Sequence, residues 1–129
     1  MELLIDSNRY SDMIRGDKVV AARFASATEL WMPLTVLGEL LGGFAFGKER
    51  RSNEAKLRRF LNKPGTGLLL LDEQTAQIYG NISASLKTQG TPIPTNDIWI
   101  AALAVQHDLT LDTRDQHFKH VPGLKLIAP

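Results

Sequence analysis

The sequence contains no cysteine. This absence excludes disulfides, thiolate metal sites and cysteine nucleophiles, and it favours a reducing, cytoplasmic setting. No signal peptide is expected, because the first residues, MELLIDSN, have neither a basic start nor a long apolar run. The longest stretch of low charge, residues 30–47, contains a proline, four glycines and one carboxylate, Glu39. A membrane-spanning helix needs about 20 mostly apolar residues, so we expect none.

Charge is unevenly distributed along the chain. The 129 residues carry a net charge of +1, with 43% hydrophobic and 22% charged residues, which is ordinary composition for one globular domain, residues 1–129. Residues 48–63, KERRSNEAKLRRFLNK, hold seven Lys or Arg and two Glu, whereas the remainder holds eight bases and twelve acids. The basic segment is either an electrostatic footprint for a polyanion or the solvated face of a helix.

Short apolar segments alternate with longer amphipathic ones. The segments typical of strands are residues 2–5, 31–34, 67–72, 109–113 and 124–127. Helices are predicted from Ser7 and over 19–30, 35–46 with Thr35 as cap, 52–62 opened by Ser52, 73–89 and 96–108, with one helical turn at 115–118. The run at 67–72, GLLLLD, is typical of a strand covered on both faces. The alternation predicts an α/β fold, a three-layer α/β/α sandwich with a central, mostly parallel sheet.

Four carboxylates fall at or near the ends of these elements: Asp6, Glu39, Asp97 and Asp115. An open parallel sheet binds its ligands at the carboxyl ends of its strands. Asp6 can instead cap a helix, Asp97 can favour the dipole of its helix, and Asp115 can start a turn. Glu39 has no such explanation, because it lies past the capping position with no base nearby in sequence. Burying it unpaired costs several kcal/mol, so it should reach water, protonate or meet a cation.

Convergence of the four acids requires a counter-charge. Two carboxylates about 5 Å apart repel by roughly 3 kcal/mol at an effective dielectric near 20. A hard divalent cation removes that cost, and carboxylate oxygens with several waters suit Mg²⁺ or Mn²⁺. Such a site can drive in-line displacement at phosphorus, since the metal activates a bound water and stabilises the leaving oxygen.

Nearly the whole chain is covered by four segments in a characteristic order: LLIDSN, VLGEL, PTNDIWIAALAVQHDLTLDTRDQHF and VPGLKLI. In this order they resemble the PIN-domain nuclease family and, within it, the VapC toxins. The resemblance implies a PIN-like fold and a Mg²⁺-dependent endoribonuclease, with Mn²⁺ as a possible substitute. It implies that Asp6, Glu39, Asp97 and Asp115 are the catalytic and metal-binding acids. It also implies that Thr113 supplies a hydroxyl that orients a water or a carboxylate.

The resemblance further implies three partners: an RNA substrate, a VapB-like antitoxin that occupies the active cleft, and a second copy of the chain in a homodimer. The RNA backbone would be attracted by the basic segment, through Arg50, Arg51, Arg58 and Arg59. An alternative is a PIN fold that binds RNA or protein without catalysis; metal binding distinguishes the two. A third class, a receiver domain or phosphatase, is disfavoured because Lys119 and Lys125 do not follow a strand end as those proteins require.

Several other residues have two interpretations. His117 and His120 can be a metal pair, but a surface or packing role fits an otherwise all-carboxylate site better. Asp112 is an extra acid that strand alternation should turn away from Thr113, so it is left out of the site. Trp99 is expected in the core. The glycines near Glu39 can keep the flanking surface low enough for RNA to approach; they are Gly38, Gly42 and Gly43.

Overall fold

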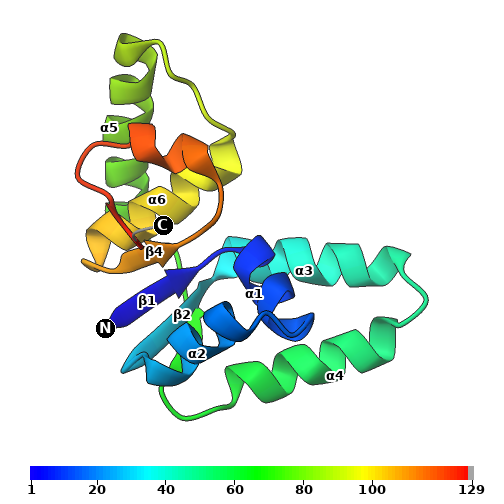
Figure 1. Ribbon diagram of the computed structural model, residues 1–129. Coiled ribbons are helices and arrows are strands. Elements are labelled where there is room, and N and C mark those ends of the chain that lie inside the picture. Colours follow the sequence, from blue (N-terminus) through cyan, green and yellow to red (C-terminus); the bar gives the residue numbers. More distant parts are fainter. Residues whose placement is uncertain (128–129) are drawn as a thin grey trace.

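A computed structural model describes residues 1–127 of the chain, which form an open sheet of five parallel strands (Figure 1). The strands are β1 (Glu2–Ile5), β2 (Glu29–Pro33), β3 (Thr66–Leu69), β4 (Thr110–Asp112) and β5 (Lys125–Leu126). Their order across the sheet is β3-β2-β1-β4-β5. In register, Leu3 faces both Leu30 and Thr110. The predicted parallel α/β architecture is therefore confirmed.

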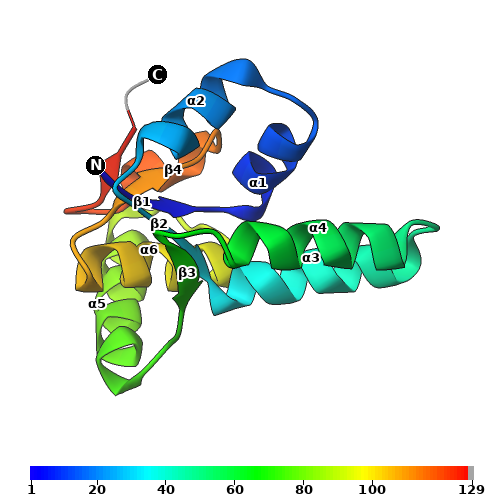
Figure 2. The same ribbon diagram turned by 90° about the horizontal axis from the view of Figure 1, so that it is seen from below.

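Helices cover both faces of this sheet. They are α1 (Ser7–Ile14), α2 (Lys18–Ser26), α3 (Leu34–Phe46), α4 (Arg50–Leu61), α5 (Glu73–Gln89), α6 (Thr95–Gln106) and the short 3-10 helix η1 (Gln116–His120). Figure 1 shows α5, α6 and η1 above the sheet and α1, α2 and α4 below it. Figure 2 shows α3 and α4 side by side, extending beyond the strands as a long pair. The layers follow from the connections: the helices between β1 and β2 lie on one face, and α5 and α6, which connect β3 to β4, lie on the other (Figure 1).

Strand β1 and helix α6 contribute many of the most deeply buried residues of the core. Leu3, Leu4 and Ile5 are almost fully buried, which is typical of a central strand covered on both faces. Helix α6 is buried nearly all round through Ile98, Ile100 and the four residues that follow it, because almost all of its residues are apolar. Among the described residues, no helix is long and apolar enough to cross a membrane.

Local signals set several helix ends as expected. The carboxylate of Asp72 accepts a hydrogen bond from the N–H of Thr75, and the Thr75 hydroxyl accepts one from the N–H of Asp72. This capping box starts α5, and Gly90, at φ 73°, ends it. The predicted bounds 73–89 are therefore confirmed.

Three predicted helix boundaries were wrong. The helix predicted over 19–30 ends at Ser26: Ala27 is extended, and the N–H of Thr28 donates to the Met1 carbonyl, which starts β2 beside β1. Thr35 does not cap α3, because the helix begins a residue earlier, after Pro33. Helix α4 opens at Arg50 rather than Ser52, with no side-chain cap.

The strand predicted at 67–72 was also partly wrong. Strand β3 stops at Leu69, and all four of its residues are only half-buried, because it lies at the edge of the sheet. Leu70, just beyond it, is 62% exposed. A run of apolar residues does not distinguish a central strand from an edge strand whose outer side is open.

Candidate active site

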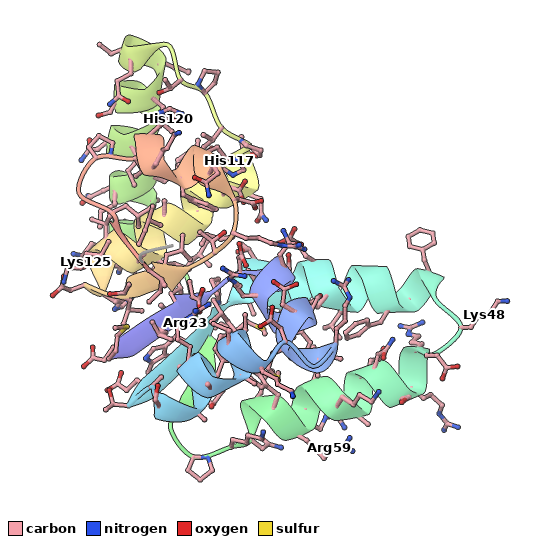
Figure 3. All side chains as sticks on the ribbon, viewed as in Figure 1. Arg23, Lys48, Arg59, His117, His120 and Lys125 are labelled. Carbon is pink, nitrogen blue, oxygen red and sulfur yellow. The ribbon has the colours of Figure 1, made fainter. Side chains whose placement is uncertain are left out.

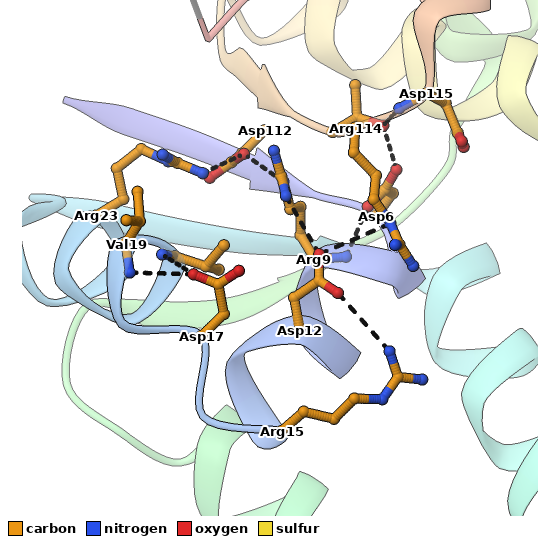
Figure 4. Close-up of polar contacts among 12 residues, drawn as sticks. Asp6, Arg9, Asp12, Arg15, Asp17, Val19, Arg23, Asp112, Arg114 and Asp115 are labelled. Atoms are coloured by element: carbon orange, nitrogen blue, oxygen red, sulfur yellow. Dashed lines mark hydrogen bonds and ion pairs between the residues drawn. The ribbon is translucent and has the colours of Figure 1, made fainter. Parts of the chain in front are cut away.

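The candidate site lies between β1 and β4. From β1 the chain runs outward through β2 to β3 on one side. Helices α5 and α6 then carry it from β3 back across the sheet to β4, on the other side of β1, so this is the point where the strand order reverses. Asp6 follows the last residue of β1, and Thr113 follows the last residue of β4. Figure 4 shows Asp6 and Asp115 together at this edge.

Asp6 is 4% exposed and is bonded from two directions. It caps α1 by accepting a hydrogen bond of 3.0 Å from the N–H of Arg9, and its other oxygen accepts one from the Thr113 hydroxyl. Burial raises the pKa of Asp6, the hydrogen bonds from Thr113 and Arg9 oppose that rise, and the charge of Asp115 adds to it. The capping role considered from the sequence is thus real, but it occupies only one carboxylate oxygen.

Asp97 and Asp115 face the same region. Asp97 lies in the first turn of α6, where its Oδ2 is 2.7 Å from Nε2 of His117. Burial raises the pKa of Asp97, His117 opposes the rise, and the charge of Asp115 adds to it. The N–H of Asp115 donates to the Thr113 hydroxyl oxygen at 3.1 Å. Because the charge of Asp115 acts on both Asp6 and Asp97, the three carboxyls lie within electrostatic reach of one another.

Of the three outcomes expected for Glu39, contact with water is the one that the structure shows. Glu39 is exposed on α3, so its carboxylate reaches water and carries no burial cost. The apolar neighbours that made it look buried point elsewhere, with Val36 and Leu40 in the core. Within residues 1–127 no hydrogen bond or ion pair fixes Glu39, so it remains free to turn toward a ligand.

The chemistry of these donors fits a hard divalent cation. Carboxylate oxygens and a hydroxyl are the ligands that Mg²⁺ and Mn²⁺ prefer. Burial, and to a lesser degree the charge of Asp115, raises the pKa values of Asp6 and Asp97, and a bound cation would favour their charged forms. In the described part of the chain, no three of the His, Asp or Glu side chains stand close enough together to hold an ion unaided. An ion bound by fewer protein ligands would need waters in its shell, and Mg²⁺ usually keeps several.

Sequence reasoning missed a buried ion-pair network behind the acids (Figure 4). Asp112, which is fully buried, accepts hydrogen bonds from Nε of Arg9 at 3.0 Å and from Nε of Arg23 at 2.7 Å. Arg9 also pairs with Asp12, at 3.2 Å. Asp112 thus turns to the arginines rather than joining the acids. The sequence signal that could have revealed this network is Arg23, the single arginine among the alanines and valines of α2.

His117 was missed as a contact of Asp97. A surface or packing role had been favoured for it and for His120, and Figure 3 shows both on η1. Its contact depends on how η1 folds back over the start of α6, which no periodicity in the sequence indicates. Trp99, expected in the core, is half-buried and stacks on Tyr79 with ring centroids 4.2 Å apart.

The basic residues of α4 lie on another part of the molecule. Figure 3 shows Arg59 at the lower face, with His117 far above it. Arg50 pairs with Glu54 at 2.9 Å, and Arg51, Arg58 and Arg59 are exposed. An RNA contact through these arginines stays a prediction, and it would have to involve RNA some distance from the acids.

The model of the PIN domain family matches residues 3–124, so the chain belongs to the PIN-domain family. Among its relatives, Toxin FitB from Neisseria gonorrhoeae is 33% identical over 121 residues, which cover 88% of this chain and 87% of that protein. Ribonuclease VapC1 from Haemophilus influenzae is 28% identical over 130 residues, which cover 97% of this chain and 96% of that protein.

The chain is also similar to solved structures of the same kind of protein. DNA-bound VapBC from Salmonella typhimurium is similar with a TM-score of 0.89 at 25% identity, over 98% of this chain and 97% of that one. FitAcB from Neisseria gonorrhoeae is similar with a TM-score of 0.82 at 29% identity, again over 98% and 97% of the two chains. The family resemblance seen in the sequence is thereby confirmed, and with it the PIN-like fold.

Proposed function

We propose that the chain is a metal-dependent endoribonuclease that acts as the VapC-like toxin of a toxin–antitoxin pair in the cytoplasm. The observation that carries the proposal is that Thr113 links Asp6 and Asp115 by hydrogen bonds at the reversal point of the sheet in a PIN-domain chain, with Asp97 within range of the charge of Asp115. Relatives are named as ribonucleases and toxins, which supports the same activity here.

We assign different roles to the acids, to Thr113 and to His117. Asp6, Asp97 and Asp115 would hold Mg²⁺ or Mn²⁺, and Glu39 would bind the ion or its water. When bound, the ion lowers the pKa of a water and stabilises charge on the leaving oxygen of the phosphodiester. The Thr113 hydroxyl fixes the rotamer of Asp6 while accepting the N–H of Asp115, so it holds two of the acids in one arrangement. His117 fixes Asp97 in the same way.

The partners follow from the relatives. Solved relatives are complexes named VapBC and FitAcB, which supports a VapB-like antitoxin as the partner of this chain. We also propose a homodimer. An antitoxin that covers the acids would block RNA, so the complex should be inactive until the antitoxin is removed.

The proposal is tested by mapping the 5′ ends of cellular RNA after brief expression of the chain, with Asp6→Ala as the control. New 5′ ends that appear only with the wild-type chain, together with growth arrest, are expected. Equal 5′-end maps for both chains, and no cleavage by the purified protein with Mg²⁺ or Mn²⁺, would refute a nuclease.

The alternative, a PIN fold that only binds RNA or protein, predicts a different metal response. None of the four acids is missing, which favours catalysis. Calorimetry that detects no Mg²⁺ or Mn²⁺ binding at millimolar metal would favour the binding module.

Glu39→Gln is expected to lower cleavage strongly while changing the free energy of unfolding by less than about 0.5 kcal/mol, because the side chain is exposed. Urea unfolding and a cleavage assay on the same preparation measure both quantities. A loss of stability with cleavage intact would instead make Glu39 a structural acid.

Gly38→Ala is expected to raise the free energy of unfolding by about 0.5–1 kcal/mol, since Gly38 is inside a helix and a Cβ there meets nothing within 4 Å. If a low surface beside Glu39 admits RNA, the same variant raises KM. Gly80→Ala is the matched control, because Gly80 is also helical and unobstructed but lies on α5. Equal KM values for both variants would show that RNA binding does not require the absence of a side chain at Gly38.

A further inference from the structure

A cavity of about 590 Å³ opens beside the candidate active site. One wall is formed by Thr113, Arg114 and Asp115, the segment that carries two of the site residues. The opposite wall is formed by α2, through Val19, Val20 and Arg23. The cavity is thus continuous with the acids but lies outside them, on the α2 side of β4 and β5. The function proposed above leaves it without a role.

Four cations line this cavity: Arg9, Arg23, Arg114 and Lys119. The lining also contains two carboxylates, Asp17 and Asp115. Asp17 already accepts hydrogen bonds from the N–H groups of Val19 and Val20, at 3.0 and 3.1 Å. Within residues 1–127, Lys119 is exposed and no carboxylate pairs with it. Three of the cations are paired with carboxylates behind the cavity: Arg9 with Asp112 and Asp12, Arg23 with Asp112, and Arg114 with Asp12. Lys119 is therefore the cation of the lining that most directly favours an anion there.

Asp112 holds two of these cations in place. Its two oxygens accept three hydrogen bonds, from Nε of Arg9 at 3.0 Å and from Nε and Nη2 of Arg23 at 2.7 and 3.1 Å. The arginine side chains remain 19% and 24% exposed, so parts of both guanidiniums reach the cavity. Because they are already fixed, they lose little rotamer entropy when they bind a ligand.

The remaining lining is apolar. Val19 is 67% exposed at the wall formed by α2, and Leu126 and Ile127 face the cavity from the sheet side. Fixed guanidiniums beside exposed aliphatic groups suit a ligand that joins a phosphate to an apolar ring or sugar face. A single nucleotide of an RNA strand has both parts.

We propose that this cavity binds the nucleotide adjacent to the scissile phosphate, with its phosphate on Arg23 and Lys119 and its ribose or base against Val19 and Leu126. The inference rests on the function proposed above, and it names the part of the substrate that the acids cannot hold. The acids need a metal to accept a phosphate, whereas this cavity attracts the neighbouring phosphate by its own charge.

The test measures RNA binding without cleavage. A short, fluorescein-labelled oligoribonucleotide of mixed sequence is titrated by fluorescence anisotropy in EDTA, in an Asp6→Asn background, with and without Lys119→Ala. Loss of a charged contact should weaken binding roughly tenfold, and the slope of log K against log salt should fall by about 0.7. Lys87→Ala, a change on α5 outside the cavity, should alter neither quantity.

Arg23→Gln provides a second variant, with urea unfolding as a check that it folds. It should weaken RNA binding to a similar degree, and in chains with the native Asp6 both variants should raise KM more than they lower kcat. Unchanged affinity, salt slope and KM in Lys119→Ala and in a folded Arg23→Gln, with RNA still cut, would overturn this inference and leave the nuclease intact. RNA bound through the cavity but never cut with Mg²⁺ or Mn²⁺ would instead overturn the proposed function.

Discussion

Replacing Asp6 with asparagine is expected to lower the rate of RNA cleavage at least about 10²-fold while the fold stays intact. The loss of roughly 3 kcal/mol of transition-state stabilisation corresponds to this factor. Asparagine keeps an oxygen that can accept the N–H of Arg9, so the cap of α1 survives. The rate is measured on total RNA with Mg²⁺, and circular dichroism checks the fold.

The same substitution has a predicted effect on stability. Burial raises the pKa of Asp6, so the folded chain holds this proton more tightly than the unfolded chain does. The stabilisation by the protonated form is complete below the unfolded pKa, about 3.9, and is lost as the pH rises through the folded value. In EDTA at neutral pH, Asp6→Asn should therefore unfold at higher urea concentration than the wild type. The difference in stability between the variant and the wild type should shrink as the pH falls toward 4. A difference that does not depend on pH would contradict a raised pKa of Asp6.

Replacing Asp112 with asparagine should cost about 3 kcal/mol of unfolding free energy. Asp112 is fully buried and compensates Arg9 and Arg23, and removing one partner of a buried ion pair typically costs this much. The new amide would also place an N–H group against a guanidinium, where both are donors. Urea denaturation measures the change.

Glu54→Gln is the matched control, because it removes a carboxylate that pairs with Arg50 on the exposed side of α4. Surface pairs of this kind contribute at most about 1 kcal/mol. If Asp112→Asn and Glu54→Gln cost the same, the network behind the acids would not be a structural support of the site.

The parts of the fold that the sequence predicted are those with strong local signals. The capping box at Asp72 and the left-handed Gly90 define α5 through contacts within a few residues. The parts that it missed depend on neighbours far along the chain. The end of α2 is set by the pairing of Thr28 with Met1, and β3 is an edge strand only because of where it lies in the sheet.

In the candidate site, too, some residues could be predicted from the sequence and others could not. Asp6 and Asp115 could be placed because parallel strands deliver their ends to one edge of the sheet. For Glu39 the sequence left contact with water, protonation and a cation open. The structure exposes it because α3 extends beyond the sheet (Figure 2). The partners of Asp112 come from α1 and α2, 103 and 89 residues away, so no spacing in the sequence reveals them.

The most direct test of the account is a calorimetric titration of Mn²⁺ into the metal-free wild type and into Asp97→Asn. Asp97 is a predicted ligand, and His117 can hydrogen-bond an amide there nearly as well, so the variant should fold. The account predicts saturable Mn²⁺ binding by the wild type and binding at least about tenfold weaker in the variant. Equal binding by both chains, or no binding by either, would contradict a metal site built from these acids.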